Sequence, residues 1–188
     1  MHKAKLREIF KNKRNELNLN LKIELSDKIN KNIIDFIGEN DINTIHCYLT
    51  HQNLNEVNTQ KIIQYIWENN KTLITSVSNT SNFTLEHYYL HPTTAIQQNK
   101  WGIPEPIDAD KANIKKIELV ITPMLCFDKQ GYRVGYGKGF YDKFFAECNT
   151  DIIKIGVSYF EPVEVIEDIN EYDFPLDFVF TPENFYAF

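Results

Sequence analysis

The chain has 188 residues, of which 43% are hydrophobic and 13% aromatic, and its formal net charge at neutral pH is −6. A chain of this length can bury a core without metal or disulfide support, and we expect a single domain over residues 1–188. The acidic total argues against a general nucleic-acid binder. The lack of a long apolar run and of a signal-peptide pattern predicts a cytoplasmic protein without membrane association.

Two helices are predicted at the start of the chain. Residues 3–17 repeat apolar side chains at helical spacing. Beside this apolar face lies a basic stripe that consists of Lys3, Arg7, Lys11 and Arg14. The pattern is typical of a solvated charged face, with contact to a ligand as the alternative. A second helix is expected to begin at a cap formed by Asn18 or Asn20 and to end at Gly38.

Short apolar segments alternate with helical patterns along the rest of the chain. Strands are predicted at residues 44–49, 71–77, 83–90, 119–125, 152–157 and 178–180. Helical spacing is formed by Ile62, Ile63, Ile66 and Trp67, and again by Tyr141, Phe144, Phe145 and Cys148. This alternation predicts an α/β fold in three layers, with a mostly parallel central sheet and helices on both faces. Residues 101–106 contain two prolines and are expected to form a rigid extended loop.

Residues 127–148 contain the most informative segment. Four of the seven glycines fall within the nine residues 131–139, between a predicted strand and a predicted helix. Glycines let successive backbone N–H groups approach a ligand, and a helix N-terminus adds unpaired N–H groups, so the segment is typical of a phosphate-binding loop. Arg133 and Lys138 add cations to this loop, and Asp142 supplies an oxygen ligand suited to Mg²⁺.

This glycine loop matches neither of the two common nucleotide-binding templates. A Walker loop requires Ser or Thr after its lysine, whereas Lys138 is followed by Gly139, and the glycines are spaced GxGxG instead of GxGxxG. A tight structural turn is therefore the alternative explanation. The charged residues around the loop favour a ligand, because a simple turn does not require them.

Other polar residues give weaker signals. Cys47, Cys126 and Cys148 form no CxxC pair and are expected to be buried thiols. His87 and His91 are four residues apart but lie in a strand-like context, which does not favour a zinc site. The charge is uneven: residues 1–31 carry nine Lys and Arg against four Asp and Glu, while the chain after residue 154 has eight Asp and Glu and no Lys or Arg. Two explanations stay open, a basic arm for a polyanion or two chain ends that attract each other or a shared ligand.

Several motifs together resemble those of the 5-formyltetrahydrofolate cyclo-ligase family. The sequence from Arg133 to Asp142, RVGYGKGFYD, is similar to the family signature. Four further segments resemble family elements in the same order: Lys3–Arg7, Glu56–Thr59, Trp101–Pro106, and the acidic segment from Asp173 to Thr181. This resemblance extends over the whole chain.

The resemblance implies a set of site residues. The ATP site would be formed by Lys3, Ala4, Lys5, Leu6 and Arg7 together with Arg133, Val134, Gly135, Tyr136, Gly137, Lys138, Gly139, Phe140 and Tyr141. The folate would contact His51, Glu56, Trp101, Lys138 and Phe140. Asp142 and Asp173 would bind Mg²⁺, and Arg133 and Lys138 would be catalytic. Phe140 stands where many relatives have tyrosine, which argues against a proton-transfer role for this position.

The resemblance also implies a reaction. Its substrates would be ATP and a reduced folate, and the enzyme would be an ATP- and Mg²⁺-dependent ligase that cyclises 5-formyltetrahydrofolate to 5,10-methenyltetrahydrofolate. We expect a monomer without a nucleic-acid partner. The alternatives from other functional classes are a non-catalytic nucleotide-binding module and an RNA-associated protein that uses the basic first helix.

Overall fold

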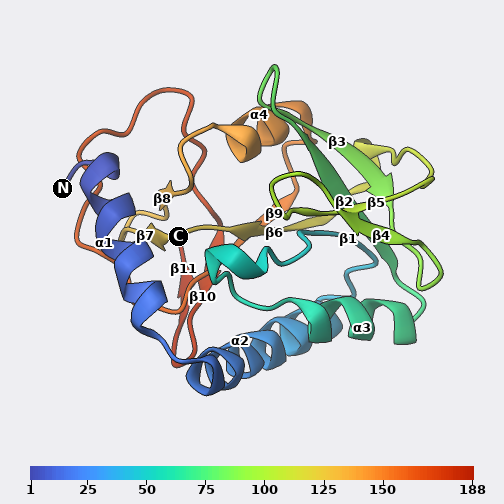
Figure 1. Ribbon diagram of the computed structural model, residues 1–188, viewed down its shortest axis with the longest axis horizontal. Helices are drawn as coiled ribbons and strands as arrows, with labels where there is room; N and C mark the ends of the chain where they lie inside the picture. The colour runs from blue at the N-terminus through green and yellow to red at the C-terminus, as the bar shows by residue number, and fades with distance from the viewer.

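A seven-stranded sheet forms the centre of the computed structural model, which describes all residues 1–188 (Figure 1). Its strand order is β11 (Phe185–Ala187), β10 (Phe178–Phe180), β9 (Ile153–Val157), β6 (Leu119–Pro123), β1 (Thr44–Cys47), β2 (Thr72–Asn79) and β3 (Thr84–Tyr89). The five inner strands are parallel, and both edge strands are antiparallel to their neighbours. The predicted α/β fold with a mostly parallel central sheet is confirmed.

Helices and two small hairpins complete the fold. The helices are α1 (Lys3–Glu16), α2 (Leu19–Glu39), α3 (Gln60–Glu68) and α4 (Phe140–Glu147), with short 3₁₀ turns η1 (Gln52–Leu54) and η2 (Ile114–Lys116). The hairpins pair β4 (Ile96–Gln98) with β5 (Pro104–Pro106), and β7 (Cys126–Phe127) with β8 (Arg133–Val134). None of the helices combines the length and the apolar character needed to cross a membrane.

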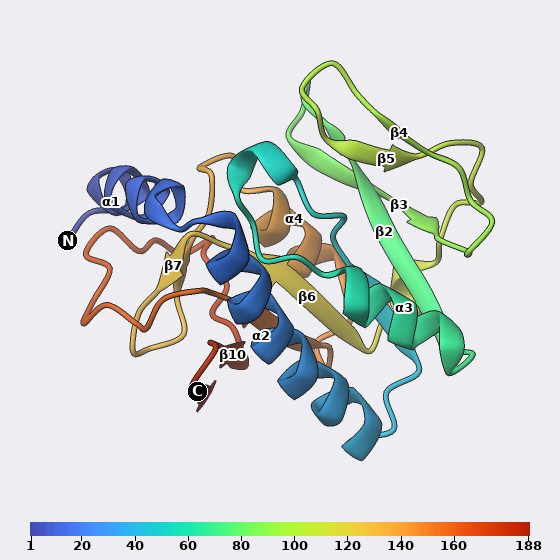
Figure 2. The same ribbon diagram turned by 60° about the horizontal axis from the view of Figure 1, so that its bottom comes forward.

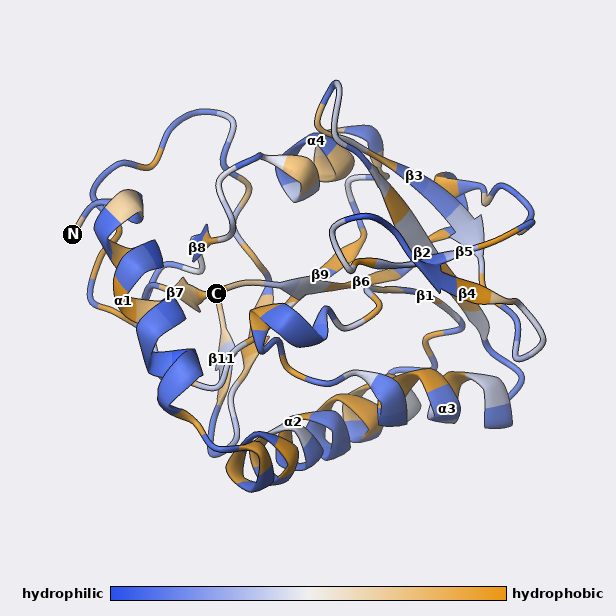
Figure 3. Cartoon of the chain, in the orientation of Figure 1, coloured by the Kyte–Doolittle hydropathy of each residue, from blue (hydrophilic) through white to orange (hydrophobic).

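The two faces of the sheet are covered by different helices (Figures 1 and 2). Helices α2 and α3 pack on one face, where Ile33 of α2 and Ile66 of α3 share a core with Ile45 of β1. Helix α4 packs on the other face, where Phe144 joins the core formed with Val120 of β6. Because side chains alternate along a strand, one strand supplies apolar groups to both layers. Figure 3 shows the resulting apolar stripes on α2 and α3.

Helix α1 lies at the end of the sheet, where it packs on the β7–β8 hairpin instead of on a face. Its Leu6 and Phe10 are buried against Val134 and Leu125. Ion pairs join this end of the chain to the acidic C-terminal region, with Lys3 Nζ 2.5 Å from Asp173 Oδ2. Two of the nine basic residues at the start of the chain, Lys3 and Lys28, thus pair with acidic residues near its end.

Several local predictions differ from the structure at the ends of elements. Gly38 lies inside α2, which ends at Glu39, so the expected helix stop was wrong. A Cβ at Gly38 would lie 3.1 Å from the hydroxyl of Tyr65, which shows that glycine permits close packing against α3. Of the two possible caps Asn18 is correct, because its side chain accepts a hydrogen bond from the N–H of Leu21. Pro104–Pro106 form an edge strand instead of a loop, and β11 was not predicted.

The topology creates a crevice at the carboxyl ends of β1 and β6. These strands are parallel neighbours at the centre of the sheet. The chain leaves β1 toward α3 on one face, and it leaves β6 through the β7–β8 hairpin toward α4 on the other. Because the two connections diverge, they leave an open space between them, which is where ligands bind in open α/β sheets.

Candidate functional site

A cavity of about 930 Å³ lies at this crevice. Its walls come from α1, the loop after β1, the glycine loop at residues 135–139, the N-terminal end of α4, the β2–β3 hairpin, and residues 168–174. This volume lies near the upper end of the roughly 300–1,000 Å³ that is typical of pockets for small molecules and cofactors. The sequence therefore brings segments from both ends of the chain to one site.

The β7–β8 hairpin positions the glycine loop. Asp128 is fully buried, and its carboxylate accepts hydrogen bonds from the backbone N–H groups of Gln130, Tyr132 and Ile166 at 3.0 Å. Gly131 closes the turn with a φ of +84°, a value that disfavours residues with a Cβ. This fixed turn directs the chain through β8 and into residues 135–139.

The glycine loop is held against α1. The Nε of Arg7 donates a hydrogen bond of 2.9 Å to the carbonyl of Gly135. Gly137 has a φ of +90°, and a Cβ there would lie 3.0 Å from the guanidinium carbon of Arg7. Gly139, with a φ of +70°, is the N-cap of α4, so the unpaired N–H groups at the start of this helix face the cavity. The loop and the helix N-terminus thus form one surface suited to an anion.

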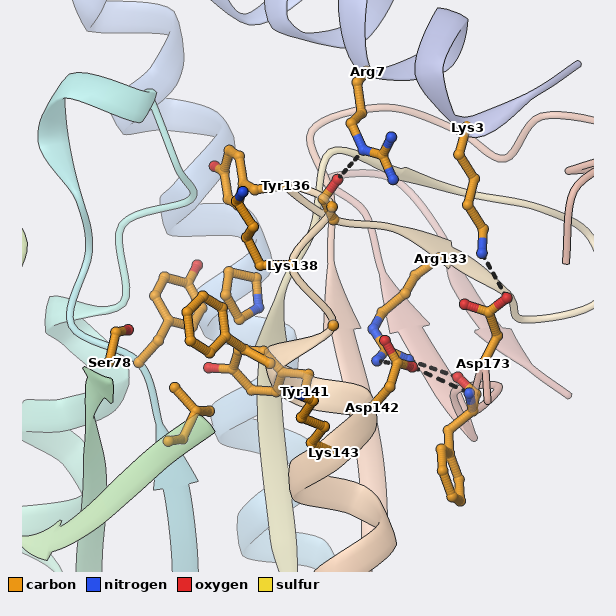
Figure 4. A pocket seen from close by; sticks show the side chains of 18 of the residues that line it. Lys3, Arg7, Ser78, Arg133, Tyr136, Lys138, Tyr141, Asp142, Lys143 and Asp173 are labelled. Carbon is orange, nitrogen blue, oxygen red and sulfur yellow. Dashed lines mark hydrogen bonds and ion pairs between the residues drawn. The ribbon is translucent and has the colours of Figure 1, made fainter. Parts of the chain in front are cut away.

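Two ion pairs lie along one wall of the cavity (Figure 4). Arg133 Nη2 is 2.6 Å from Asp142 Oδ1, and Arg133 Nη1 donates to the carbonyl of Phe174 at 2.6 Å. Burial lowers the pKa of Arg133, and the charge of Asp142 opposes this shift. The second pair joins Lys3 to Asp173, whose Oδ2 also accepts from the N–H of Asn170. Arg133 is therefore held by Asp142 and is less free to reach a ligand than the sequence suggested.

The donor set around Asp142 and Asp173 fits Mg²⁺ bound together with phosphate. In each carboxylate one oxygen accepts the protein hydrogen bonds, while the other, Oδ2 of Asp142 and Oδ1 of Asp173, accepts none. No cluster of three or more His, Cys, Asp or Glu side chains is present to enclose a metal ion. Mg²⁺ at nucleotide sites typically uses one or two carboxylates and completes its octahedral shell with phosphate oxygens and water.

Three cations of the cavity form no ion pair: Arg7, Lys138 and Lys143, whose Nζ donates to the carbonyl of Asn82 at 2.7 Å. The Nζ of Lys138 lies 4.9 Å from the ring centroid of Phe83, at the turn between β2 and β3. Phe83 has a φ of +57°, which is unusual for an aromatic residue, and its ring is 6.1 Å from that of Phe140. A cation held only by an aromatic ring can exchange that contact for an anionic ligand at small cost.

Glu56 lies across the cavity from the ion pairs and is buried, with 8% of its surface exposed. Its Oε2 accepts a hydrogen bond of 2.9 Å from the backbone N–H of His51, and its Oε1 accepts one of 3.0 Å from the hydroxyl of Tyr136. Burial raises the pKa of Glu56, while these hydrogen bonds and the charge of Arg14 oppose the rise. Because a carboxylate has about four acceptor positions, Glu56 can still bind donors of a ligand.

Most of the predicted site residues line this cavity. Those that do are Lys3, Ala4, Arg7, His51, Glu56, Arg133, Asp142 and Asp173, together with the run from Gly135 to Tyr141. Lys5 is exposed and pairs with Glu8, whereas Leu6 of α1 and Val134 of β8 are buried in the same core cluster. Trp101 lies outside the cavity, 49% exposed and next to Lys100, and the neighbouring Ile103 and Pro104 line the wall instead.

The prediction of a solvated basic stripe on the first helix was wrong for three of its members. Arg14 is only 2% exposed, Lys3 is paired with Asp173, and Arg7 contacts the glycine loop. Lys11 alone is exposed and unpaired. The stripe is thus no open surface for a polyanion, and nothing in the structure favours the RNA-associated alternative.

Sequence reasoning missed part of the wall. The β2–β3 hairpin contributes Ser76, Ser78 and Leu85, and the loop before β10 contributes Asn170, Glu171 and Tyr172. The alternation of polar residues in β2 was the available signal for the first group. For the second group only the resemblance around Asp173 pointed to the region.

Comparisons with known proteins identify relatives of this chain. Residues 1–182 match the model of the 5-formyltetrahydrofolate cyclo-ligase family. The 5-formyltetrahydrofolate cyclo-ligase of Haemophilus influenzae is 29% identical over 145 residues, which are 72% of this chain and 74% of that protein. The enzyme of the same name from Escherichia coli K12 is 31% identical over 68% of this chain and 72% of its own length. The NMR structure of Aquifex aeolicus 5,10-methenyltetrahydrofolate synthetase superposes with a TM-score of 0.83 and 25% identity, over 100% of this chain and 93% of that one.

Proposed function

Because the chain belongs to the 5-formyltetrahydrofolate cyclo-ligase family, we propose that its cavity binds Mg-ATP and 5-formyltetrahydrofolate together and joins formyl carbon to folate nitrogen 10. The family carries out the ATP-dependent conversion of 5-formyltetrahydrofolate to 5,10-methenyltetrahydrofolate, so the protein is an enzyme of folate metabolism. The observation that carries the proposal is a single cavity lined both by a glycine loop suited to an anion and by the buried carboxylate Glu56.

The reaction needs activation by phosphate. The carbon of the formyl amide on nitrogen 5 is a poor electrophile, and its oxygen is a poor leaving group. Transfer of the γ-phosphoryl group to the formyl oxygen gives an iminium phosphate and ADP. Nitrogen 10 then attacks the formyl carbon, and departure of phosphate with loss of the nitrogen 10 proton yields the methenyl bridge. The protein's contribution is positioning and charge stabilisation, because no covalent intermediate on the enzyme is required.

ATP is assigned to the glycine-loop side of the cavity. The backbone of residues 135–139 and the N-terminus of α4 would hold the phosphates, with Arg7 and Lys138 as the cations free to contact them. Arg133 would act mainly by fixing Asp142. Asp142 and Asp173 would hold Mg²⁺, which would screen the phosphate charges.

The folate is assigned to the opposite side. Glu56 would accept hydrogen bonds from the amino and ring N–H groups of the pterin, which a carboxylate can do with both oxygens. His51 belongs to the same loop, and Phe140 and Tyr141, the first two residues of α4, line the same cavity. This arrangement would place the formyl group beside Lys138, between the two halves of the cavity.

The direct test is incubation with 5-formyltetrahydrofolate and Mg-ATP while the near-ultraviolet absorbance of the methenyl product is followed. We expect Lys138→Ala to fold normally and to lose turnover by ~10²–10³-fold, the scale of a lost electrostatic donor. Lys129→Ala is the matched control, because Lys129 is exposed and paired with Glu164 outside the cavity. No product with the unmodified protein would refute the function, and near-normal turnover of the Lys138 variant would refute its role.

A further inference from the structure

Arg14 is the most deeply buried cation of the molecule, and the function proposed above leaves it without a role. It comes from α1 and is 2% exposed. Its Nη1 donates to the hydroxyl of Tyr136 at 3.1 Å and to the carbonyl of Leu54, while Nη2 donates to the carbonyl of Met124. One guanidinium thus connects the glycine loop, the loop after β1 and the loop after β6, the three connections that meet at the cavity.

The charge of Arg14 has no directly paired carboxylate. Its nearest anionic partner is reached through Tyr136, whose hydroxyl accepts from Arg14 and donates to Glu56 Oε1 at 3.0 Å. Tyr136 lies between Gly135 and Gly137, so a residue of the nucleotide loop is the link between the two buried charges. An uncompensated buried charge is strongly unfavourable, and this chain of hydrogen bonds lets Arg14 and Glu56 neutralise each other.

We propose that Arg14 is a positioning residue for the folate: through Tyr136 it keeps Glu56 ionised and directed into the cavity, as an acceptor for the N–H groups of the pterin. The inference rests on the proposed function and assigns a role to a residue outside the cavity wall. It also gives Tyr136 a purpose beyond that of a loop residue, because its hydroxyl transmits the effect of Arg14 to Glu56.

Arg14 shares this task with the backbone N–H of His51, which also opposes the rise in the pKa of Glu56. The titratable groups that face Glu56 are Arg14 from α1, Tyr136 from the glycine loop, His51 from its own loop, Tyr48 after β1, Tyr141 from α4, and Tyr159 after β9. Burial raises the pKa of each of these tyrosines, so they stay neutral. Arg14 is the one group among them with a permanent positive charge.

Loss of that charge has a defined consequence. Burial already raises the pKa of Glu56, and Arg14 opposes this rise. Without Arg14 the carboxyl group takes up a proton at higher pH, and a protonated carboxyl presents an O–H where the pterin needs an acceptor. The folate must then displace a proton to bind. Below the new pKa, KM for folate rises roughly tenfold for each unit by which the pH falls. KM for ATP is unaffected.

The test compares Arg14→Gln, Arg14→Lys and Tyr136→Phe with the unmodified enzyme between pH 6 and 8. We expect the ratio of KM for 5-formyltetrahydrofolate, variant over unmodified enzyme, to rise steeply toward low pH for Arg14→Gln. It should be nearly independent of pH for Arg14→Lys, which keeps the charge. Tyr136→Phe retains the ring and the fold, loses the link, and should show a smaller slope of the same sign.

The outcomes separate the inference from the function on which it rests. A pH-independent ratio for both Arg14→Gln and Tyr136→Phe, in an enzyme that forms product, overturns the role of Arg14 alone. An unmodified enzyme that forms no product overturns the proposed function. Calorimetric titration of Arg14→Gln with 5-formyltetrahydrofolate in two buffers gives a second readout, since binding should release about one proton that the unmodified enzyme does not release. Equal proton release by both proteins contradicts the inference.

Discussion

Gly135→Ala distinguishes a phosphate-binding loop from a simple turn. Gly135 has no positive φ, and no atom lies within 4 Å of the position that a Cβ would take. An alanine therefore fits the backbone and the packing. Replacement of glycine at a compatible position typically stabilises a protein by about 0.4–1 kcal/mol, because the unfolded chain has fewer conformations. The folded structure should thus be as stable as before or slightly more stable.

The expected effect on ATP is large, because the open space around Gly135 belongs to the cavity. A methyl group there would keep the phosphates away from the loop N–H groups. The loss of one hydrogen bond to a charged group weakens binding by about 1.5–3 kcal/mol, which corresponds to roughly a ten- to hundredfold rise in KM for ATP. KM for the folate should change less, because an alanine at position 135 leaves the hydrogen bond between Tyr136 and Glu56 in place.

The assay measures KM for ATP from methenyl formation and the free energy of unfolding from urea titration. Gly137→Ala is the comparison, because its φ of +90° and a contact of 3.0 Å with Arg7 predict a loss of stability as well. The strain alone amounts to about 1–2 kcal/mol. A Gly135→Ala variant with normal stability and an unchanged KM for ATP would show that the loop is only a turn.

Three further predictions concern stability. Asp142→Ala leaves the buried guanidinium of Arg133 unpaired and should lower the free energy of unfolding in urea by about 3–5 kcal/mol. The double variant Asp142→Ala with Arg133→Met should lose less stability, because it removes both charges. An equal loss of stability in the two variants would contradict this pairing. His46 and His87 are buried side by side under α4, and burial lowers the pKa of His46 and brings that of His87 to about 4. Histidines in the unfolded chain titrate near pH 6.5, so the free energy of unfolding should fall as the pH drops from about 6.5 toward 4. The decrease should be up to roughly 1.4 kcal/mol per pH unit for each histidine. His87→Leu should remove the part of this pH dependence that comes from His87. Gly156→Ala places a methyl group 2.5 Å from a leucine side chain and should lower stability by about 1–3 kcal/mol, with an unchanged thermal midpoint as the contradicting result.

The contrast between Lys138 and Arg133 shows how far sequence reasoning reached into the site. Both were expected to stabilise phosphate charge, because both flank the glycine loop. In the structure Lys138 has no carboxylate partner, whereas Arg133 is held by Asp142 and the carbonyl of Phe174. Both residues are basic and both lie beside the glycine loop, so the sequence alone does not distinguish them. Only the tertiary structure, which places Asp142 of α4 and the carbonyl of Phe174 beside Arg133, separates an available cation from one that is already bound.

The short edge strands illustrate the same limit for the fold. β5 and β11 have three residues each, and none of these residues is fully buried. Each forms because a neighbouring strand offers unpaired backbone groups, β4 in one case and β10 in the other. The longer buried strands were predictable because their own apolar side chains specify burial on both faces.

The sequence by itself determined the α/β architecture, the glycine loop and the position of its flanking charges, because periodicity and glycine content act locally on the backbone. Tertiary structure alone decided which charges meet. Lys3 and Asp173 are 170 residues apart, and Arg14 reaches Glu56 through a tyrosine of a third segment. Such pairings depend on where distant segments pack, and the free energy of a buried charge is set by those neighbours and not by the residues beside it in the chain.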